Sequence, residues 1–188
     1  HRQAKDSHII KLASAINNQR LDDDDFISHQ DVIFYKGDNS SIKRVILNQI
    51  KGAIDKGYDL IDDIQVLIPQ YKGDLGIDIM NQEIQKHFNP KFGQGLKMTY
   101  GDKSYYEGDK VIQLLNDNDK KVMNGDIGVI RKIFKTERET LMMQIDFDET
   151  TVFYEQSDLE NLNLAYVISI HKSQGSEYPA VVIVLSMA

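Results

Sequence analysis

The stretch that decides the fold reads Ala165-Tyr-Val-Ile-Ser-Ile-His-Lys-Ser-Gln-Gly-Ser-Glu-Tyr-Pro-Ala-Val-Val-Ile-Val-Leu185. Its polar residues at 171–174 are followed by Gly175 and Glu177, and then by an apolar run of strand length at 181–185. A glycine directly after a periodic segment is a helix C-cap signal. Polar groups at a strand junction of an α/β protein are where ligands usually bind. The alternative interpretation is an ordinary polar helix end.

Before residue 90 the apolar spacing alternates between helical and strand periods. Helices are expected at 7–18, 40–57 and 77–88, and strands at 32–35 and 64–68. Ser40 or Ser41 is the expected N-cap of the second helix. Pro69 ends the buried strand at 64–68. Alternating strands and helices of this kind favour a parallel sheet.

The pattern changes after Gly95. Short β-branched and aromatic runs, separated by Gly-Asp and Asn-Gly turns, predict strands at 111–115, 128–134, 141–147 and 151–154. Their spacing is typical of a small β-barrel, and a helical period returns near Leu164. We therefore expect an α/β domain at 1–95 that continues at 161–188 and is interrupted by a β-barrel insert at 96–160.

Composition limits the classes of function. With 188 residues and 41% hydrophobic content, the chain is long enough to bury a core. The formal net charge of -7 means that any nucleic-acid contact must be a local groove. Cysteine is absent, which excludes disulfides and suits a cytoplasmic protein. No apolar run is long enough for a membrane, and the five histidines lack paired metal-ligand spacing.

The run His-Lys-Ser-Gln-Gly-Ser-Glu at 171–177, followed by an aromatic residue, resembles motif V of superfamily 1 DNA helicases of the RecD/TraA branch. The resemblance implies the second RecA-like domain (2A) of a P-loop-NTPase-type motor, interrupted by a Src-homology-3-like barrel (2B). It further implies a RecD-like, ATP-dependent helicase that moves 5′ to 3′ along single-stranded DNA and unwinds duplex. In motif V, His171, Lys172 and Ser173 are then expected to contact DNA. Gln174, Gly175 and Glu177 are expected at the nucleotide.

Arg2-Gln3-Ala4 would mean nothing alone, because a lone arginine is usually a solvated surface charge. In the family, Phe-Arg-Gln-Ala is the motif IV signature, so the resemblance makes Arg2 the catalytic arginine at the terminal phosphate of ATP. A guanidinium suits that role because it is permanently charged and its fork matches phosphate oxygens. His1 stands where the family has an aromatic residue, which puts the surroundings of Arg2 in doubt.

The loop Gln70-Tyr-Lys-Gly-Asp-Leu-Gly76 joins a buried strand to a helix. Its glycines permit a tight turn with backbone amides exposed at a helix N-terminus, which is a natural phosphate seat. The alternative is an ordinary strand-to-helix turn. The resemblance places this loop along single-stranded DNA, with Gln70, Tyr71, Lys72 and Gly73 as contacts.

Two further blocks, 107–116 and 122–129, read as hairpins whose Gly-Asp and Asn-Gly pairs satisfy turn geometry. Members of the family have a closely similar sequence here: Gly-Asp-x-Val-x-Gln ending in Asn, and then Asn-Gly-Asp-x-Gly. By that resemblance, Gln113, Asn116 and Asn124 are expected to face DNA.

The sequence contains no Gly-Lys-Ser/Thr phosphate loop and no acidic magnesium motif. We therefore expect a fragment that is inactive alone. ATP with Mg²⁺ would be bound together with the N-terminal RecA-like domain of the same parent chain. Two other interpretations stay open: a non-catalytic module that binds nucleic acid or protein through its barrel, and the helicase part of a conjugative relaxase.

Overall fold

The structure is a computed structural model that describes residues 38–69 and 73–184. The chain divides into two compact units. Unit 1 is built from the chain before Asn81 and from Val167 onward, and unit 2 is Asn81–Tyr166. Unit 2 covers a longer range than the insert expected at 96–160. It begins within helix α3 (Ile77–Phe88) and ends directly before strand β9 (Val167–Ile168). The helix and strand expected at 7–18 and 32–35 lie outside the described residues.

The described part of unit 1 begins with helix α2, Asn39–Asp55. Its N-cap is Asp38, whose carboxylate accepts a hydrogen bond from the backbone N–H of Ser41 at 2.8 Å. The expected caps, Ser40 and Ser41, instead lie in the first turn of the helix, because a carboxylate before them satisfies the free amides. Ile46 and Ile50 form the buried side of the helix.

The sheet of unit 1 is parallel, as the alternation of helices and strands predicted. Its strands are β1 (Ile64–Leu67), β9 (Val167–Ile168) and β10 (Ala180–Ile183), in the order β10-β1-β9. Strand β1 pairs with a neighbour on each side and all its residues are buried. A fully buried strand explains the continuous apolar run in this part of the sequence.

Helix α3, Ile77–Phe88, follows β1 in the chain and was predicted with the same bounds. Ile77, Met80 and Ile84 are buried on one side, as the helical period requires. The helix runs from unit 1 into unit 2, because the boundary between the units lies between Met80 and Asn81.

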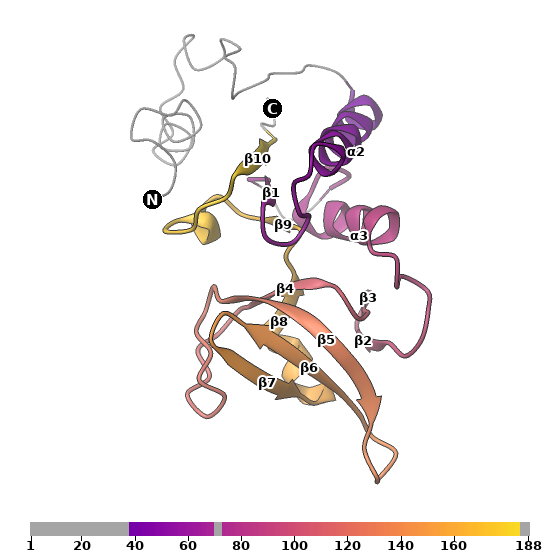
Figure 1. Ribbon diagram of the computed structural model, residues 1–188, viewed down its shortest axis with the longest axis vertical. Helices are drawn as coiled ribbons and strands as arrows, with labels where there is room; N and C mark the ends of the chain where they lie inside the picture. Colours follow the sequence, from indigo (N-terminus) through magenta and orange to yellow (C-terminus); the bar gives the residue numbers. More distant parts are fainter. Residues whose placement is uncertain (1–37, 70–72, 185–188) are drawn as a thin grey trace. The chain divides into compact units, whose positions relative to one another are not determined.

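Unit 2 contains a short hairpin and a five-stranded antiparallel sheet (Figure 1). The hairpin is formed by β2 (Met98–Tyr100) and β3 (Lys103–Tyr105). The sheet has the order β7-β6-β5-β4-β8, with β4 Lys110–Gln113, β5 Ile127–Lys135, β6 Leu141–Phe147, β7 Thr150–Tyr154 and β8 Leu162–Leu164. Within the described residues no pairing joins β7 to β8, so this is an open sheet and not a closed barrel.

Gly128 in β5 is required by close packing of the strands. A Cβ atom built on this residue would lie 2.8 Å from the backbone oxygen of Asp146 and 2.8 Å from a side-chain carbon of Ile145. Such distances are far inside van der Waals contact, so no other residue fits without moving the neighbouring strand β6.

The helical period expected near Leu164 is wrong. Residues 162–164 form β8, 167–168 form β9, and only a short 3-10 helix, η3 at His171–Ser173, follows. Every residue at 162–170 is buried, and a continuously buried run has no amphipathic period that separates a helix from a strand. A second 3-10 helix, η2 at Gln156–Asn161, connects β7 to β8.

Candidate nucleic-acid interface

Strands β1 and β9 of unit 1 end at the same edge of the sheet. They pair in parallel through Val66 with Val167 and Leu67 with Ile168, and the N–H of Ile68 donates to the oxygen of Ile168 at 3.1 Å. The ends of β1 and β9 therefore lie side by side. In α/β sheets this carboxyl edge is where ligands bind.

The segment after β9 is a tight polar turn. The hydroxyl of Ser169 accepts from the N–H of Lys172 at 3.2 Å, and the hydroxyl of Ser173 donates to the oxygen of Ile170 at 2.6 Å. His171 is exposed, whereas Lys172 and Ser173 are half-buried. The Ser173 hydroxyl thus braces the turn, and the phosphate contact expected of it requires that this bond be exchanged.

The residues expected at the nucleotide follow directly. Gln174 and Gly175 are exposed, and Gly175 has a φ of 80°, in the left-handed region that favours glycine. The N–H of Ser176 donates to the oxygen of Ser173 at 3.1 Å, which closes the turn, and Glu177 is half-buried. Burial raises the pKa of the neighbouring Tyr178 hydroxyl.

After Pro69, the structure describes the chain again from Gly73 onward. Gly73 is exposed with a φ of 93°, and the N–H of Gly76 donates to its carbonyl oxygen at 2.9 Å. This turn leads directly into α3. Gln70, Tyr71 and Lys72 lie outside the described residues, as does Arg2.

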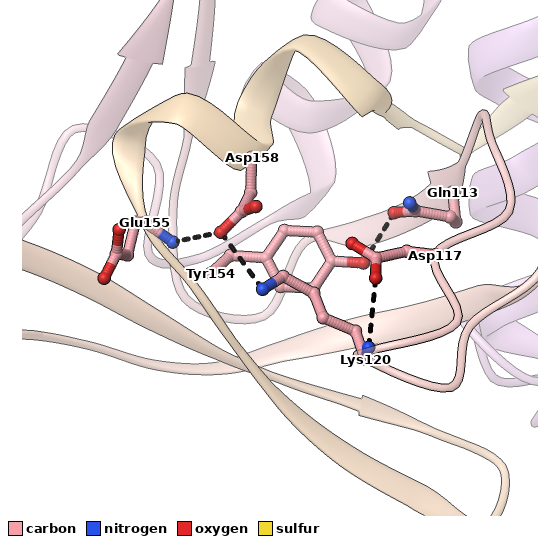
Figure 2. Close-up of polar contacts among 6 residues, drawn as sticks. All are labelled: Gln113, Asp117, Lys120, Tyr154, Glu155 and Asp158. Atoms are coloured by element: carbon pink, nitrogen blue, oxygen red, sulfur yellow. Dashed lines mark hydrogen bonds and ion pairs between the residues drawn. The ribbon is translucent and has the colours of Figure 1, made fainter.

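Gln113 does not face solvent, which corrects its expected contact with DNA. Its side chain is 1% exposed at the end of β4. The hydroxyl of Tyr154 donates to its Oε1 at 2.5 Å (Figure 2), and its Nε2 donates to the oxygen of Leu115 at 2.9 Å. Both ends of the amide are therefore occupied inside unit 2, and Gln113 is a core residue.

Asn116 and Asn124 are exposed and lie together in the loop between β4 and β5. The Oδ1 of Asn116 accepts from the backbone N–H of Asn124 at 2.8 Å. Asn116 thus stabilises this loop through a hydrogen bond between residues eight positions apart, whereas the sequence predicted only a local Asn-Gly turn.

Lys120 connects the same loop to η2 through an ion pair with Asp158. The sequence did not predict this contact. The Nζ of Lys120 lies 3.5 Å from an oxygen of Asp158 and 5.9 Å from the centre of the Tyr154 ring, while its backbone N–H donates to Asp117 at 3.0 Å (Figure 2). The carboxylate of Asp158 also accepts from the N–H of Glu155 at 2.8 Å. Contacts between residues so far apart in sequence leave no local signal.

A buried carboxylate, Asp109, was also missed. It is 0% exposed and accepts hydrogen bonds from four donors: the Tyr166 hydroxyl, the amides of Asn89 and Gln85, and the backbone N–H of Tyr106. Burial raises the pKa of this carboxyl, and the four hydrogen bonds oppose that shift. The Gly-Asp pair had been interpreted only as turn chemistry.

The described residues contain no group of three or more His, Asp and Glu side chains that could hold a metal ion. None of the described helices is both long enough and apolar enough to cross a membrane.

Two family models match the chain. Residues 80–147 match the ATP-dependent RecD-like DNA helicase SH3 domain, and residues 164–188 match the UvrD-like helicase C-terminal domain. The first match covers most of unit 2, and the second covers the stretch with η3 and β10.

Two curated relatives agree with these models. The ATP-dependent RecD2 DNA helicase of Deinococcus radiodurans is 37% identical over 125 residues, which is 66% of this chain and 16% of that protein. The RecBCD enzyme subunit RecD of Buchnera aphidicola is 27% identical over 205 residues, covering 98% of this chain and 33% of that protein. The chain therefore spans a third or less of these relatives.

Among solved structures, the Pif1 helicase from Bacteroides in complex with ADP-AlF3 and ssDNA has a TM-score of 0.52 at 18% identity. The similarity covers 100% of this chain and 45% of that one, and it supports the fold. The two family models and the two relatives show that the chain belongs to the RecD-like superfamily 1 DNA helicases.

Proposed function

We propose that the carboxyl edge of the parallel sheet in unit 1 holds single-stranded DNA in an ATP-dependent, RecD-like helicase. The observation that supports this proposal is the parallel pairing of β1 with β9, because the sequence continues from these two strands toward the Gly73 turn and the His171 turn. Exposed His171 and half-buried Lys172 supply donors for backbone phosphates there. Gln70, Tyr71 and Lys72 directly precede Gly73 and complete the proposed DNA contacts.

The nucleotide is proposed to bind on the other side of the same turn. Gln174 and Gly175 are exposed, and a glycine with positive φ allows the backbone to approach a phosphate or ribose closely. Glu177 is assigned to a ribose hydroxyl and Arg2 to the terminal phosphate. ATP with Mg²⁺ would supply the free energy of movement, and the magnesium ligands are assigned to the N-terminal RecA-like domain of the parent chain.

The parent enzyme is proposed to work in the cytoplasm and to move 5′ to 3′, as the family resemblance implies. The 188-residue sequence carries no Gly-Lys-Ser/Thr phosphate loop. We therefore expect the chain alone to show no steady ATP hydrolysis, and turnover by the purified chain would contradict this. A conjugative relaxase with the same helicase part would use the same sheet edge.

Binding of a short oligothymidylate at several salt concentrations tests the DNA proposal. We expect the logarithm of the affinity to fall with the logarithm of salt, with a slope of about -0.7 per phosphate neutralised. Lys172→Ala should weaken binding by roughly tenfold. Lys51→Ala is the matched control, because Lys51 is an exposed lysine on α2 of the same unit. Equal affinities of the two variants would contradict the proposal.

One observation favours a second function, a partner-binding module. Leu115 and Met123 are 58% and 53% exposed on the braced loop between β4 and β5. Large apolar side chains on a rigid loop are suited to protein contacts. Salt-insensitive or absent DNA binding by the chain would favour this alternative.

A further inference from the structure

Along the sequence, the boundaries of unit 2 are close to the two turns of the proposed DNA edge. The chain enters unit 2 through α3, whose first residue directly follows the Gly73–Gly76 turn. It leaves at Tyr166, which directly precedes β9 and, beyond it, the turn of His171. Along the sequence, the first part of α3 separates the Gly73–Gly76 turn from the start of unit 2, and β9 lies between the end of unit 2 and the His171 turn.

Inside unit 2 the entering and leaving segments are tied to each other. The Nδ2 of Asn81, in α3, donates to the backbone oxygen of Leu164 at 3.1 Å. A second and larger connection runs through Asp109. Its Oδ1 accepts from the Tyr166 hydroxyl at 2.7 Å and from Asn89 at 2.7 Å, and its Oδ2 accepts from Gln85 at 2.8 Å.

Asp109 supplies this cluster with two acceptor oxygens. Two oxygens accept from four donors, the fourth being the N–H of Tyr106 at 2.8 Å. An asparagine would direct an NH₂ group at some of these donors, because only one of its two terminal atoms is an acceptor. The side chains of Asp109, Gln85 and Asn89 are all buried, so water cannot replace a lost partner.

We infer that Asp109 is a positioning residue that fixes α3 to the exit segment at Tyr166, so that the two turns of the DNA edge are displaced together. The inference rests on the proposed function. In a motor, a nucleotide-driven movement has to reach both sides of the strand that it grips. Asp109 would act through α3 and β9 and would touch neither DNA nor nucleotide.

The test uses the full-length parent helicase with Asp109→Asn and Tyr166→Phe. Tyr105→Phe is the matched control, since it also removes a buried hydroxyl of unit 2, one that donates to the Leu162 oxygen at 3.0 Å. We expect Tyr166→Phe to speed amide exchange at 81–89 and 162–168 by roughly ten- to a hundredfold, as expected for a lost hydrogen bond to a charged group.

The decisive measurement is a ratio of two rates. The first is the rate at which base pairs of a duplex are separated, and the second is the rate of ATP hydrolysis in the presence of single-stranded DNA. We expect this ratio to fall about fivefold or more in Asp109→Asn and Tyr166→Phe, with ATP hydrolysis within about twofold of wild type. The Tyr105→Phe control should keep the wild-type ratio.

An unchanged ratio in Tyr166→Phe would overturn the inference even if exchange became faster, because a merely structural bond alters exchange alone. If Asp109→Asn does not fold, Tyr166→Phe carries the test by itself. The proposed function fails separately, if Lys172→Ala leaves DNA binding of the parent unchanged. A parent that loses DNA binding with Lys172→Ala but unwinds normally with Tyr166→Phe rejects only the role of Asp109.

Discussion

The polar residues at the sheet edge of unit 1 and those in the interior of unit 2 look alike in sequence but differ in the structure. His171 and Gln174 point into solvent from a turn that is braced by its own backbone and serines. Gln113 and Asp109 are buried, and every side-chain oxygen of theirs accepts a hydrogen bond.

This difference separates two uses of polar side chains. A buried and fully bonded amide or carboxylate fixes the position of segments that are distant in sequence. An exposed one on a braced turn is available to a ligand. Mutations in unit 2 should therefore change stability before they change DNA binding, and mutations at the edge of unit 1 should do the reverse.

The largest expected effect is that of Asp109→Ala. Removing the carboxylate leaves the donors of Tyr166, Asn89 and Gln85 unsatisfied inside unit 2. We expect the free energy of unfolding to fall by about 3–5 kcal/mol, measured by urea denaturation. A loss of less than about 1 kcal/mol would show that water reaches the cluster.

Gln113→Ala should come next. It removes the acceptor of the Tyr154 hydroxyl and the donor to Leu115, so we expect a loss of roughly 2 kcal/mol in urea denaturation. Affinity for oligothymidylate should stay unchanged. Tyr154→Phe is the control, since it removes the same hydrogen bond from the other side. Weaker DNA binding with unchanged stability would restore the role first expected of Gln113.

The pH dependence of the free energy of unfolding tests the role of the buried Asp109 carboxyl in unit 2. Burial raises the pKa of Asp109 above its ordinary value of 3.8, so the folded state binds its proton more tightly than the unfolded state does. The stability that this group contributes is full below pH 3.8 and is lost as the pH rises through the raised pKa. The difference in unfolding free energy between wild type and Asp109→Asn should shrink as the pH rises above that range. A pH-independent difference would contradict the raised pKa.

The smallest effect is expected for Lys120→Ala. The Nζ of Lys120 lies 3.5 Å from Asp158 and both side chains are partly exposed. Ion pairs of this kind contribute about 0.5 kcal/mol, and salt should reduce the contribution further. Lys120→Met keeps the packing against Tyr154 and serves as the control for lost contact area. An effect above about 2 kcal/mol would mean that the loop depends on this one pair.

The elements that were predicted well have strong local patterns. β6 was predicted at 141–147 and is found there, and α3 was predicted with its observed bounds. In both, the alternation of apolar and polar residues follows the period of the element, since one face is buried and the other is less buried. The parallel sheet of unit 1 followed from the order of such elements.

The features that were missed depend on distant partners. The strands β8 and β9 are buried throughout and carry no period, so their conformation is decided by pairing with β4 and β1. The burial of Gln113 depends on Tyr154, and the Asp109 cluster joins residues from 85 to 166. The residue pattern placed the polar residues at 171–174 at a strand junction, and β9 ends shortly before them, but neither the pattern nor the family resemblance separated core amides from exposed ones.

In the proposed function, the Gly73 turn and the His171 turn contact one DNA strand. The sequence has no cysteine, so single cysteines can be placed at Asp74, at His171, and at Glu137 in an exposed turn of unit 2 as control. The measurement is the rate of maleimide alkylation with and without excess oligothymidylate. We predict slower alkylation at positions 74 and 171 and no change at 137. Equal rates with and without DNA at 74 and 171 would show that these two turns do not contact the DNA strand.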